Sequence, residues 1–581
     1  MGYREAYTKW LNDADIDQST KDELRAIAGN EREIEDRFFR ELEFGTGGLR
    51  GVLGAGSNRL NIYTIRRATQ GLANYILKAD DYKPGMGVVI AHDSRHMSPE
   101  FTMETALVFN ANGIKTFVFD SLRPTPVLSY AVRHLGCIAG IVITASHNPP
   151  EYNGYKVYWS DGGQCTYPRD NAIIDEVNNV TDFSMVKKMP KAQAVKNGLY
   201  NIAPADVDDM YIANVKSCCQ NPSIIAKSDI KIVFTPLHGA GNVPVRRVLE
   251  ESGFKHVYVV AKQELPNGDF PTVSSPNPED SDAYSLALEL AGQVDADVII
   301  ATDPDADRVG VAVKHNNKHV ILTGNMVGSI LTEYLLSQMQ ANGRLPQNSA
   351  IISTIVSSDM GCKIAKSYGA TYLDVLTGFK YIGEKMNEFE ESGTHTFVFG
   401  YEESYGYLTG TYARDKDAVV ASLLVCEAAA HYKLQGLTLY DVLLQLYKKH
   451  GLHLELTTSL TMKGTEGLQD IQRIMASLRT QPPTSLGGSV LVESRDYLNK
   501  RIKYLHDGRE EATSLPISDV LYFTTKDGSW ACIRPSGTEP KIKLYFGICL
   551  PPTATMEDAS AKLTALADDM KSNITPVTVG R

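Results

Sequence analysis

Three aspartates alternate within the segment Thr302-Asp-Pro-Asp-Ala-Asp-Arg308, directly after an apolar run typical of a buried strand. In an extended loop, alternate side chains point the same way. Asp303, Asp305 and Asp307 would then present their carboxylates to one hard divalent cation. Pro304 favours extended backbone at Asp303. Carboxylates without an imidazole favour Mg²⁺ over zinc, and the triplet therefore predicts a magnesium site.

Other interpretations of the triplet fit less well. A solvated acidic turn is the simplest alternative. An EF-hand is excluded, because it needs Gly at loop position six and Glu at position twelve, where this chain has Arg308 and Lys314. A dehalogenase-type phosphatase also has an aspartate pair after a strand. There, however, the aspartate is the nucleophile and usually lies early in its domain.

A serine lies in a second loop that follows an apolar run, Thr144-Ala-Ser-His-Asn-Pro-Pro150. Adjacent residues rarely hydrogen-bond as nucleophile and base, so we expect no protease-like triad of Ser146 and His147. A serine that accepts phosphate needs a cation to neutralise charge, and the aspartate loop could supply it. Lys156, ten residues later, could transfer protons or contact phosphate. The alternative is that Lys156 is a surface residue.

A third segment, Arg534-Pro-Ser-Gly-Thr-Glu-Pro-Lys541, has the residue types of a phosphate cradle. Arg534 offers a bidentate fork, and Ser536 and Thr538 offer hydroxyls. Gly537 lets a backbone N–H approach an anion closely. A tight turn between strands is the alternative interpretation.

Two further loops could contact a ligand. Phe44-Gly-Thr-Gly-Gly-Leu-Arg-Gly51 is a glycine turn or another anion contact, through Arg50. Glu402, Glu403 and Ser404 offer acceptors suited to sugar hydroxyls, although paired glutamates are commonly surface residues.

The elements that must position these loops form a weak internal repeat of buried strands and amphipathic helical stretches. The strands are predicted at 87–91, 115–119 and 141–144, then at 230–234, 256–260 and 297–301, and then at 350–354, 370–374 and 394–399. Helices are expected before Phe44. The pattern predicts three similar mixed α/β domains in tandem, and ligands bind beyond the carboxyl ends of parallel strands. The loops after the last strand of each copy could converge on one cleft.

The length of 581 residues exceeds what one hydrophobic core supports. We expect α/β domains at 1–207, 208–321 and 322–455, carrying the serine, aspartate and glutamate loops respectively. A smaller α+β domain at 456–581 would carry the Arg534 loop around a central cleft.

The composition limits the classes of partner that we expect for this protein. The net charge of −11 argues against nucleic acid, although a locally basic cleft could still bind a small anion. No apolar run reaches the ~18 residues of a membrane span. The first ten residues lack a signal-peptide core, and the 8 cysteines include no Cys-x-x-Cys pair. We expect a cytoplasmic protein with no membrane partner.

These loops, in this order, resemble those of the α-D-phosphohexomutase superfamily, which includes phosphoglucomutases, phosphomannomutases and phosphopentomutases. The resemblance extends from Phe44 to about Phe546, and the run Thr144–Pro149 is highly specific to the superfamily. The resemblance implies roles for Ser146, Lys156 and Arg50 in catalysis; Ser146, Asp303, Asp305 and Asp307 in metal binding; Glu402, Ser404 and Lys380 in sugar binding; Arg534, Ser536, Gly537, Thr538 and Lys543 in phosphate binding; and His147 and Arg308 in support.

Some positions depart from the superfamily pattern. Pro304 and Ala306 occupy positions that are often glycine in the metal loop, and Tyr401 replaces a glycine of the sugar loop. Together with the length and the run Thr377–Lys380, they look like the branch of bacterial α-phosphoglucomutases and phosphopentomutases. They leave the chemistry intact but put the sugar identity in question.

The resemblance implies an intramolecular phosphotransferase that uses a phosphoserine and a sugar bisphosphate. We expect it to interconvert α-D-glucose 1-phosphate and glucose 6-phosphate, with Mg²⁺ as cofactor and glucose 1,6-bisphosphate as activator. Phosphopentomutase, phosphomannomutase and sugar-phosphate phosphatase activities are the alternatives. A silent phosphosugar sensor would have lost its nucleophile, so the intact Ser146 and aspartate triplet argue against it.

Overall fold

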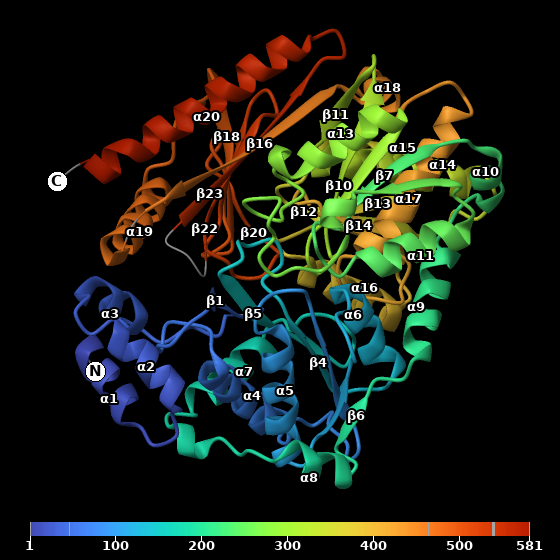
Figure 1. The fold of residues 1–581 in the computed structure, drawn as a ribbon. Coiled ribbons are helices and arrows are strands. Elements are labelled where there is room, and N and C mark those ends of the chain that lie inside the picture. Colours follow the sequence, from blue (N-terminus) through green and yellow to red (C-terminus); the bar gives the residue numbers. More distant parts are fainter. Residues whose placement is uncertain (1, 46, 463, 537–540, 580–581) are drawn as a thin grey trace. The chain divides into compact units, whose positions relative to one another are not determined.

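The computed structural model describes residues 2–45, 47–462, 464–536 and 541–579 (Figure 1). The chain divides into two compact units, residues 1–324 with 379–438 and residues 325–378 with 439–581. The first unit holds the serine and aspartate loops, and the second holds the Arg534 loop.

The expected N-terminal helices are present and form their own small core, drawn in blue in Figure 1. They are α1 (Tyr3–Asn12), α2 (Gln18–Ala26) and α3 (Glu31–Phe38). The Asp17 side chain caps α2 by accepting a hydrogen bond from Thr20 N, which satisfies one of the free N–H groups of the first turn. The apolar faces bury Trp10, Leu24, Ile34 and Phe38 against one another.

The first α/β domain is built on a mixed sheet in the order β1-β5-β4-β2-β3-β6. The strands are β1 (Gly48–Val52), β2 (Gly87–His92), β3 (Lys115–Val118), β4 (Ala139–Ile143), β5 (Tyr152–Trp159) and β6 (Tyr200–Ile202). Its helices are α4 (Ile62–Ile76), α5 (Ser98–Ala111), α6 (Thr125–His134), α7 (Arg169–Asn178) and α8 (Lys191–Lys196). Strands β2, β3, β4 and β6 are parallel, whereas β5 and β1 add antiparallel to β4.

The second α/β domain repeats this plan in the order β11-β10-β9-β7-β8. Its strands are β7 (Lys231–Thr235), β8 (His256–Val259), β9 (Val298–Thr302), β10 (Val309–His315) and β11 (Lys318–Leu322). Its helices are α9 (Asp206–Ser217), α10 (Pro222–Lys227), α11 (Asn242–Ser252), α12 (Ala261–Glu264) and α13 (Ser285–Val294). Every residue of β9 is buried, as expected for a strand covered on both faces.

The third copy of the repeat contributes to both units. In the first unit lie α16 (Phe379–Ser392), the antiparallel pair β14 (Thr396–Tyr401) and β15 (Tyr407–Thr409), and α17 (Ala418–Lys433). In the second unit lie α14 (Gly324–Ala341), the parallel pair β12 (Ser349–Thr354) and β13 (Thr371–Val375), α15 (Asp359–Ser367) and α18 (Leu439–His450). Gly324, the first residue of α14, still belongs to the first unit.

The C-terminal domain is an antiparallel sheet in the order β16-β23-β22-β21-β18-β19-β20. Its strands are β16 (Leu452–Thr461), β17 (Ser485–Leu486), β18 (Ser489–Asp496), β19 (Arg501–Tyr504), β20 (Glu510–Ala512), β21 (Leu521–Thr525), β22 (Trp530–Pro535) and β23 (Lys541–Leu550). Helices α19 (Gly464–Thr480) and α20 (Met556–Val579) lie against β23, and α20 also packs on β16 (Figure 1).

The predicted repeat is confirmed, and the architecture is the expected tandem of mixed α/β domains followed by an α+β domain. Each of the nine predicted strands is present within two residues of its expected bounds. The antiparallel strands β1, β5, β10, β11 and β15 were not predicted, and they turn each sheet from parallel to mixed.

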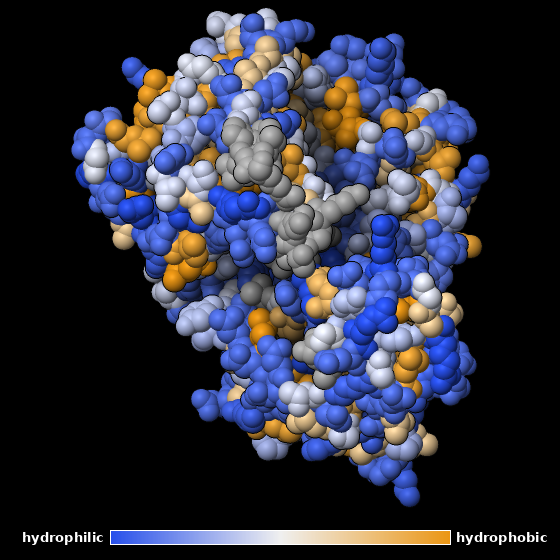
Figure 2. All heavy atoms as spheres, turned by 90° about the vertical axis from the view of Figure 1, so that its left-hand side faces the viewer, coloured by the Kyte–Doolittle hydropathy of each residue, from blue (hydrophilic) through white to orange (hydrophobic). Residues whose placement is uncertain are grey.

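The surface shown in Figure 2 carries small, separate hydrophobic patches among hydrophilic residues. Scattered apolar side chains of this kind are ordinary on a folded protein. Among the described residues, no helix combines the length and the apolar character that crossing a membrane requires.

Candidate active site

The loop that carries Ser146 begins where the buried strand β4 ends. Ser146 is 2% exposed and has φ 54°, in the left-handed region that residues other than glycine seldom adopt. Its backbone N–H donates to Thr144 Oγ1 over 2.8 Å, which fixes the start of the turn. The predicted strand-end position of the serine is therefore confirmed, in a tightly held conformation.

The Ser146 hydroxyl reaches the aspartate loop of the second domain. Ser146 Oγ donates to Asp303 Oδ2 over 2.8 Å, so the serine and metal loops meet. Ser146 Oγ also lies 3.2 Å from His147 Nδ1. The two adjacent side chains are thus in hydrogen-bond contact, but the hydroxyl hydrogen points to Asp303, so the contact is not that of a nucleophile and its base. Because the single hydroxyl hydrogen is directed to Asp303, a hydrogen bond between His147 and Oγ requires the hydrogen to be on Nδ1 of the ring.

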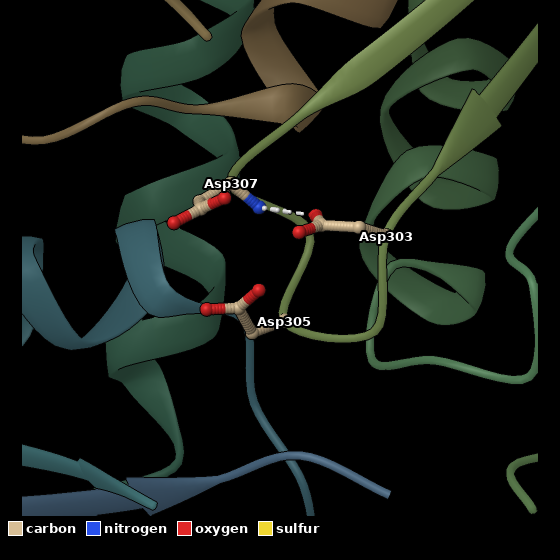
Figure 3. Close-up of side chains that lie close together, drawn as sticks. All are labelled: Asp303, Asp305 and Asp307. Carbon is tan, nitrogen blue, oxygen red and sulfur yellow. Dashed lines mark hydrogen bonds between the residues drawn. The ribbon is translucent and has the colours of Figure 1, made fainter. Parts of the chain in front are cut away.

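The aspartates are brought together by a turn. Ala306 N donates to Asp303 O over 2.9 Å, and Ala306 has φ 47°. The predicted extended conformation was therefore wrong, because hydrogen bonds within the loop outweigh the extended preference before Pro304. Asp303 Oδ1 accepts from Asp307 N over 3.2 Å (Figure 3). It also accepts from Arg308 N over 3.0 Å.

The carboxylates of Asp303, Asp305 and Asp307 are buried and close enough to share one metal ion, with candidate ligand atoms within 4.8 Å of one another (Figure 3). Burial and repulsion from the other two carboxylates raise the pKa of Asp303 well above its usual range. Among the described residues, Asp305 Oδ1 and Asp307 Oδ1 are buried without a hydrogen-bond partner. Unpaired hard oxygen atoms in this position fit a divalent cation.

Buried lysines offset the negative charge of the triplet. Lys156 Nζ donates to Asp305 Oδ2 over 2.7 Å and to Asp307 Oδ2 over 3.0 Å. Lys416 Nζ lies 3.4 Å from Asp307 Oδ2. Burial alone would raise the pKa of Asp307, but Lys156 and Lys416 hold that pKa below its usual range. Lys156 is thus not the plain surface residue that was its alternative interpretation.

The antiparallel pair β1–β5 brings two predicted residues to the serine. Gly48 lies opposite Lys156 and Arg50 lies opposite Gly154 in the register of this pair. Arg50 Nη1 donates to Asn148 Oδ1 over 3.4 Å, a long contact with the serine loop. The pair β1–β5 therefore places Arg50 beside the loop of Ser146.

Two residues at the cluster were missed by sequence reasoning. Thr125 Oγ1 donates to Asp305 Oδ2 over 2.7 Å from the first turn of α6. Lys416 lies in the run Arg414–Asp417, directly before the buried helix α17. A run of charged residues before an apolar helix was a usable signal for Lys416, whereas Thr125 carried none.

The predicted sugar loop is joined to the metal loop. Arg308 forms a β-bridge with Gly406, and Val309 N donates to Tyr405 O over 3.1 Å. Glu402 is 5% exposed, and Ser404 is half-buried. The Glu402 carboxylate contributes to raising the pKa of Lys416, after Asp307 and Asp415 and against the effect of burial. The Glu402 carboxylate therefore lies near Lys416, at the edge of the aspartate cluster, and Ser404 follows two residues later in the same loop.

Arg308 and Lys380 have different surroundings. Arg308 Nη1 donates to Glu279 Oε1 over 2.8 Å and its Nε lies 3.8 Å from Asp307 Oδ1, which suits its predicted supporting position. Lys380 Nζ lies 3.4 Å from Asp170 Oδ2 in the first domain. In the part of the chain that is described, its contacts are with Asp170 and the Tyr381 ring, and the aspartate cluster is not among them.

The remaining predicted residues lie in the second unit. Arg534 on β22 is half-buried and lies opposite Lys543 of β23. Ser536 N donates to Lys541 O over 2.7 Å at the end of this hairpin. Gly537 and Thr538 lie outside the described residues.

Comparison with known proteins finds relatives along most of the chain. Models of the phosphoglucomutase/phosphomannomutase α/β/α domains I, II and III match residues 41–183, 209–317 and 323–450, and the model of the C-terminal domain matches residues 469–557. A phosphoglucomutase of Staphylococcus aureus (strain USA300) is 36% identical over 558 residues, 95% of this chain and 97% of its own length. One from Staphylococcus haemolyticus is 36% identical over 515 residues, 88% of this chain and 91% of its own.

Solved structures share the fold at lower identity. A putative phosphomannomutase from Thermus thermophilus has a TM-score of 0.67 at 20% identity and covers 92% of this chain and 99% of its own. The open form of parafusin from Paramecium has a TM-score of 0.66 at 18% identity and covers 93% and 96%. With four domain models matched in order and relatives 36% identical over nearly the whole length, the chain belongs to the phosphoglucomutase/phosphomannomutase family.

Proposed function

We propose that the chain is a phosphoglucomutase that interconverts α-D-glucose 1-phosphate and glucose 6-phosphate. The Staphylococcus relatives, which match nearly its whole length, bear that name. The observation that carries the proposal is the hydrogen bond from Ser146 Oγ to Asp303 Oδ2, because it joins a nucleophilic hydroxyl to a buried carboxylate cluster.

The proposed reaction consists of two phosphoryl transfers. Phospho-Ser146 gives its phosphoryl group to the free hydroxyl of the sugar monophosphate: the P–O bond to Ser146 breaks, a P–O bond to the sugar forms, and the proton of the sugar hydroxyl ends on Ser146 Oγ, which becomes a hydroxyl again. The bisphosphate turns around and returns its other phosphoryl group to Ser146. Charge is neutralised and groups are positioned largely by preorganised side chains, as in other phosphoryl transfers. Glucose 1,6-bisphosphate is the proposed activator, because it rephosphorylates enzyme that has lost its intermediate.

Mg²⁺ is the proposed metal. Asp303, Asp305 and Asp307 would hold it together with the phosphate on Ser146, and the unpartnered Oδ1 atoms of Asp305 and Asp307 fit this use. When bound, the ion would offset negative charge on the phosphoryl group. Lys156 and Arg50 are proposed to assist by placing positive charge beside the aspartate triplet and the serine loop, respectively.

The remaining assignments concern substrate binding. We propose that Glu402, Ser404 and Lys380 bind the sugar. The loop containing Arg534, Ser536, Gly537, Thr538 and Lys543 would hold the phosphate that is not being transferred, while His147 and Arg308 support the serine and metal loops. The proposed domain boundaries remain 1–207, 208–321, 322–455 and 456–581.

A side-by-side assay tests the proposal. Purified protein with Mg²⁺ and a trace of glucose 1,6-bisphosphate is given glucose 1-phosphate, mannose 1-phosphate or ribose 1-phosphate, and products and free phosphate are measured. We expect the highest kcat/KM with glucose 1-phosphate and no stoichiometric phosphate release. Preference for ribose 1-phosphate would make the protein a phosphopentomutase, and release of phosphate would make it a phosphatase.

A further inference from the structure

The buried side chain of Arg95 contacts the serine loop at several carbonyl groups. Its guanidinium donates to Ser146 O over 2.6 Å, to Pro149 O over 2.8 Å and to Tyr152 O over 3.0 Å, and it also donates to Asn148 O. The Arg95 side chain is 0% exposed. A guanidinium offers several N–H donors in a rigid planar fork, so one side chain can hold carbonyls on both sides of a turn.

The carboxylate of Asp93 completes this arrangement. Asp93 Oδ1 accepts from Arg95 N over 2.9 Å and from Ser98 Oγ over 3.0 Å. Asp93 Oδ2 accepts from Thr144 Oγ1 over 2.6 Å, and Thr144 Oγ1 in turn accepts from Ser146 N over 2.8 Å. Ser146 is therefore held at its N–H through Thr144 and at its carbonyl by Arg95, the two holds being joined at Asp93.

Asp93, Arg95 and Thr144 together form a clamp on the serine loop. Both the conformation of the loop and the burial of the clamp are energetically unfavourable. The left-handed conformation of Ser146 is unfavourable for a residue with a Cβ atom. Removing the charges of Asp93 and Arg95 from water is also costly. A well-packed pair of apolar residues often gives a folded protein at least as much stability as a buried ion pair. An expensive buried ion pair whose hydrogen bonds end on the serine loop is therefore better explained by placement of that loop than by stability alone.

The second domain also contacts the clamp and the serine loop. The Arg95 guanidinium carbon lies 5.0 Å from the centre of the Phe270 ring. Ser275 Oγ donates to His147 O over 2.8 Å, and His96 Nε2 lies 2.6 Å from Asp269 Oδ1. The clamp thus connects Ser146 to the domain that supplies Asp303.

We propose that Arg95 is a positioning residue for phosphoryl transfer: with Asp93, it holds Ser146 in the left-handed conformation that directs its Oγ to Asp303. The inference rests on the proposed function, because it assigns Arg95 to the transfer at Ser146. Arg95 acts on the backbone of the loop, so its loss changes the rate of transfer and leaves the groups assigned to substrate binding in place.

Arg95→Lys is the main variant, since it keeps a cation but cannot span the same carbonyls. Thr144→Val is the milder one and removes the hydroxyl that links Asp93 to Ser146 N. Arg59→Lys is the control. Arg59 is also buried, ion-paired to Asp36 and hydrogen-bonded to the carbonyl oxygens of Asp36 and Asn58, and these contacts lie outside the site.

Three quantities separate positioning from a structural role: kcat and KM, the rate at which glucose 1,6-bisphosphate phosphorylates Ser146, and hydrogen exchange of peptides covering residues 144–152. We expect Arg95→Lys to lower kcat and the phosphorylation rate about 100-fold with KM nearly unchanged. Thr144→Val should act in the same direction with a smaller effect. Both should speed exchange in 144–152, whereas Arg59→Lys changes neither rate nor exchange there.

The outcomes separate the inference from the proposed function. Wild-type kcat and wild-type exchange in Arg95→Lys would overturn the inference while the wild type still turned over glucose 1-phosphate. If the wild type itself converts no sugar phosphate, the proposed function fails. The exchange measurement still decides whether Arg95 holds the loop.

Discussion

At Ser146, a single hydroxyl meets a buried carboxylate and an imidazole, 2.8 and 3.2 Å away. A serine hydroxyl is a poor nucleophile at neutral pH unless its surroundings activate it. The nearby Asp303 carboxylate has a raised pKa because it is buried beside Asp305 and Asp307. A cation at the triplet would relieve this repulsion and so stabilise the charged form of all three carboxylates.

The first prediction concerns the metal. Exhaustive chelation should abolish turnover, and added Mg²⁺ should restore it, because the aspartates supply hard oxygen ligands. Asp305→Asn should lower kcat/KM about 10²–10³-fold, the range seen when one preorganised electrostatic group is lost. Calorimetric titration with Mg²⁺ should show weakened binding in this variant.

Asp295→Asn is the matched control. Asp295 is an exposed residue of the same domain with φ 55°, a conformation that asparagine accepts. The Asp295→Asn variant should bind Mg²⁺ and convert substrate like the wild type. Full activity of the wild type after chelation would contradict the assignment of the triplet as a metal site.

At the scale of elements, the paired strands β1 and β5 position two positively charged side chains near the serine loop and the aspartates. It places Arg50 beside Asn148 and Lys156 against the aspartates. Gly154 lies opposite Arg50 in the register, and a Cβ atom there would lie 2.4 Å from Thr144 O and 2.8 Å from Leu49 O. Both are backbone atoms, so the strands themselves would have to separate.

Gly154→Ala should therefore destabilise the first domain by about 1–3 kcal/mol, the usual cost of overpacking, and reduce turnover in the folded fraction. Gly292→Ala is the control, in the exposed part of helix α13 with open space around its Cβ position. Alanine there should be neutral or stabilise by about 0.5–1 kcal/mol. Thermal unfolding and kcat measured on both variants check this. Equal melting temperatures of Gly154→Ala and the wild type would show that the β1–β5 pair tolerates a side chain at residue 154.

The parallel strands of the fold could be predicted because they are continuous apolar runs, such as Val298–Thr302. The antiparallel strand β5 could not, since Tyr152–Trp159 mixes polar and aromatic residues and its burial depends on the sheet that it joins. For the same reason the sequence did not show how Lys156 reaches the aspartates.

The site residues with distinctive loop motifs were predictable, but their geometry was not. Alternation suggested an extended aspartate loop, whereas the turn with Ala306 in the left-handed region brings the carboxylates together. The contact between Ser146 and His147 also depends on a left-handed residue. Such local conformations depend on tertiary hydrogen bonds like those of Arg95, which leave no pattern in the chain.

At the scale of the molecule, buried titratable groups outside the site make stability depend on pH. His453 on β16 is 3% exposed, and burial, with a contribution from Lys363, lowers its pKa to about 4. Its ring also contacts Cys549 Sγ at 3.4 Å and lies near His450. Because the folded pKa lies below the unfolded value, His453 contributes stability that is present above pH 6.5 and is lost as the pH falls toward 4.

His453→Gln should remove about 2 kcal/mol of the fall in local stability between pH 7 and pH 4.5, since each pKa unit corresponds to about 1.4 kcal/mol. Hydrogen exchange in β16 and β23, compared between variant and wild type at each pH, measures it. The neighbouring Glu455, whose pKa burial raises to about 7, acts in the opposite direction and is cancelled by this comparison. His506→Gln, at an exposed histidine, should change nothing. A parallel pH response of wild type and His453→Gln would contradict the prediction.

The phosphorylation state of Ser146 tests the account most directly. Peptide mass spectrometry of the purified protein, before and after a brief exposure to glucose 1,6-bisphosphate, should show an added mass of about 80 Da on the peptide that contains Ser146. Ser146→Ala should lose both this mass and nearly all turnover of glucose 1-phosphate, while keeping its melting temperature. An alanine variant that converts glucose 1-phosphate at the wild-type rate would contradict the proposed mechanism.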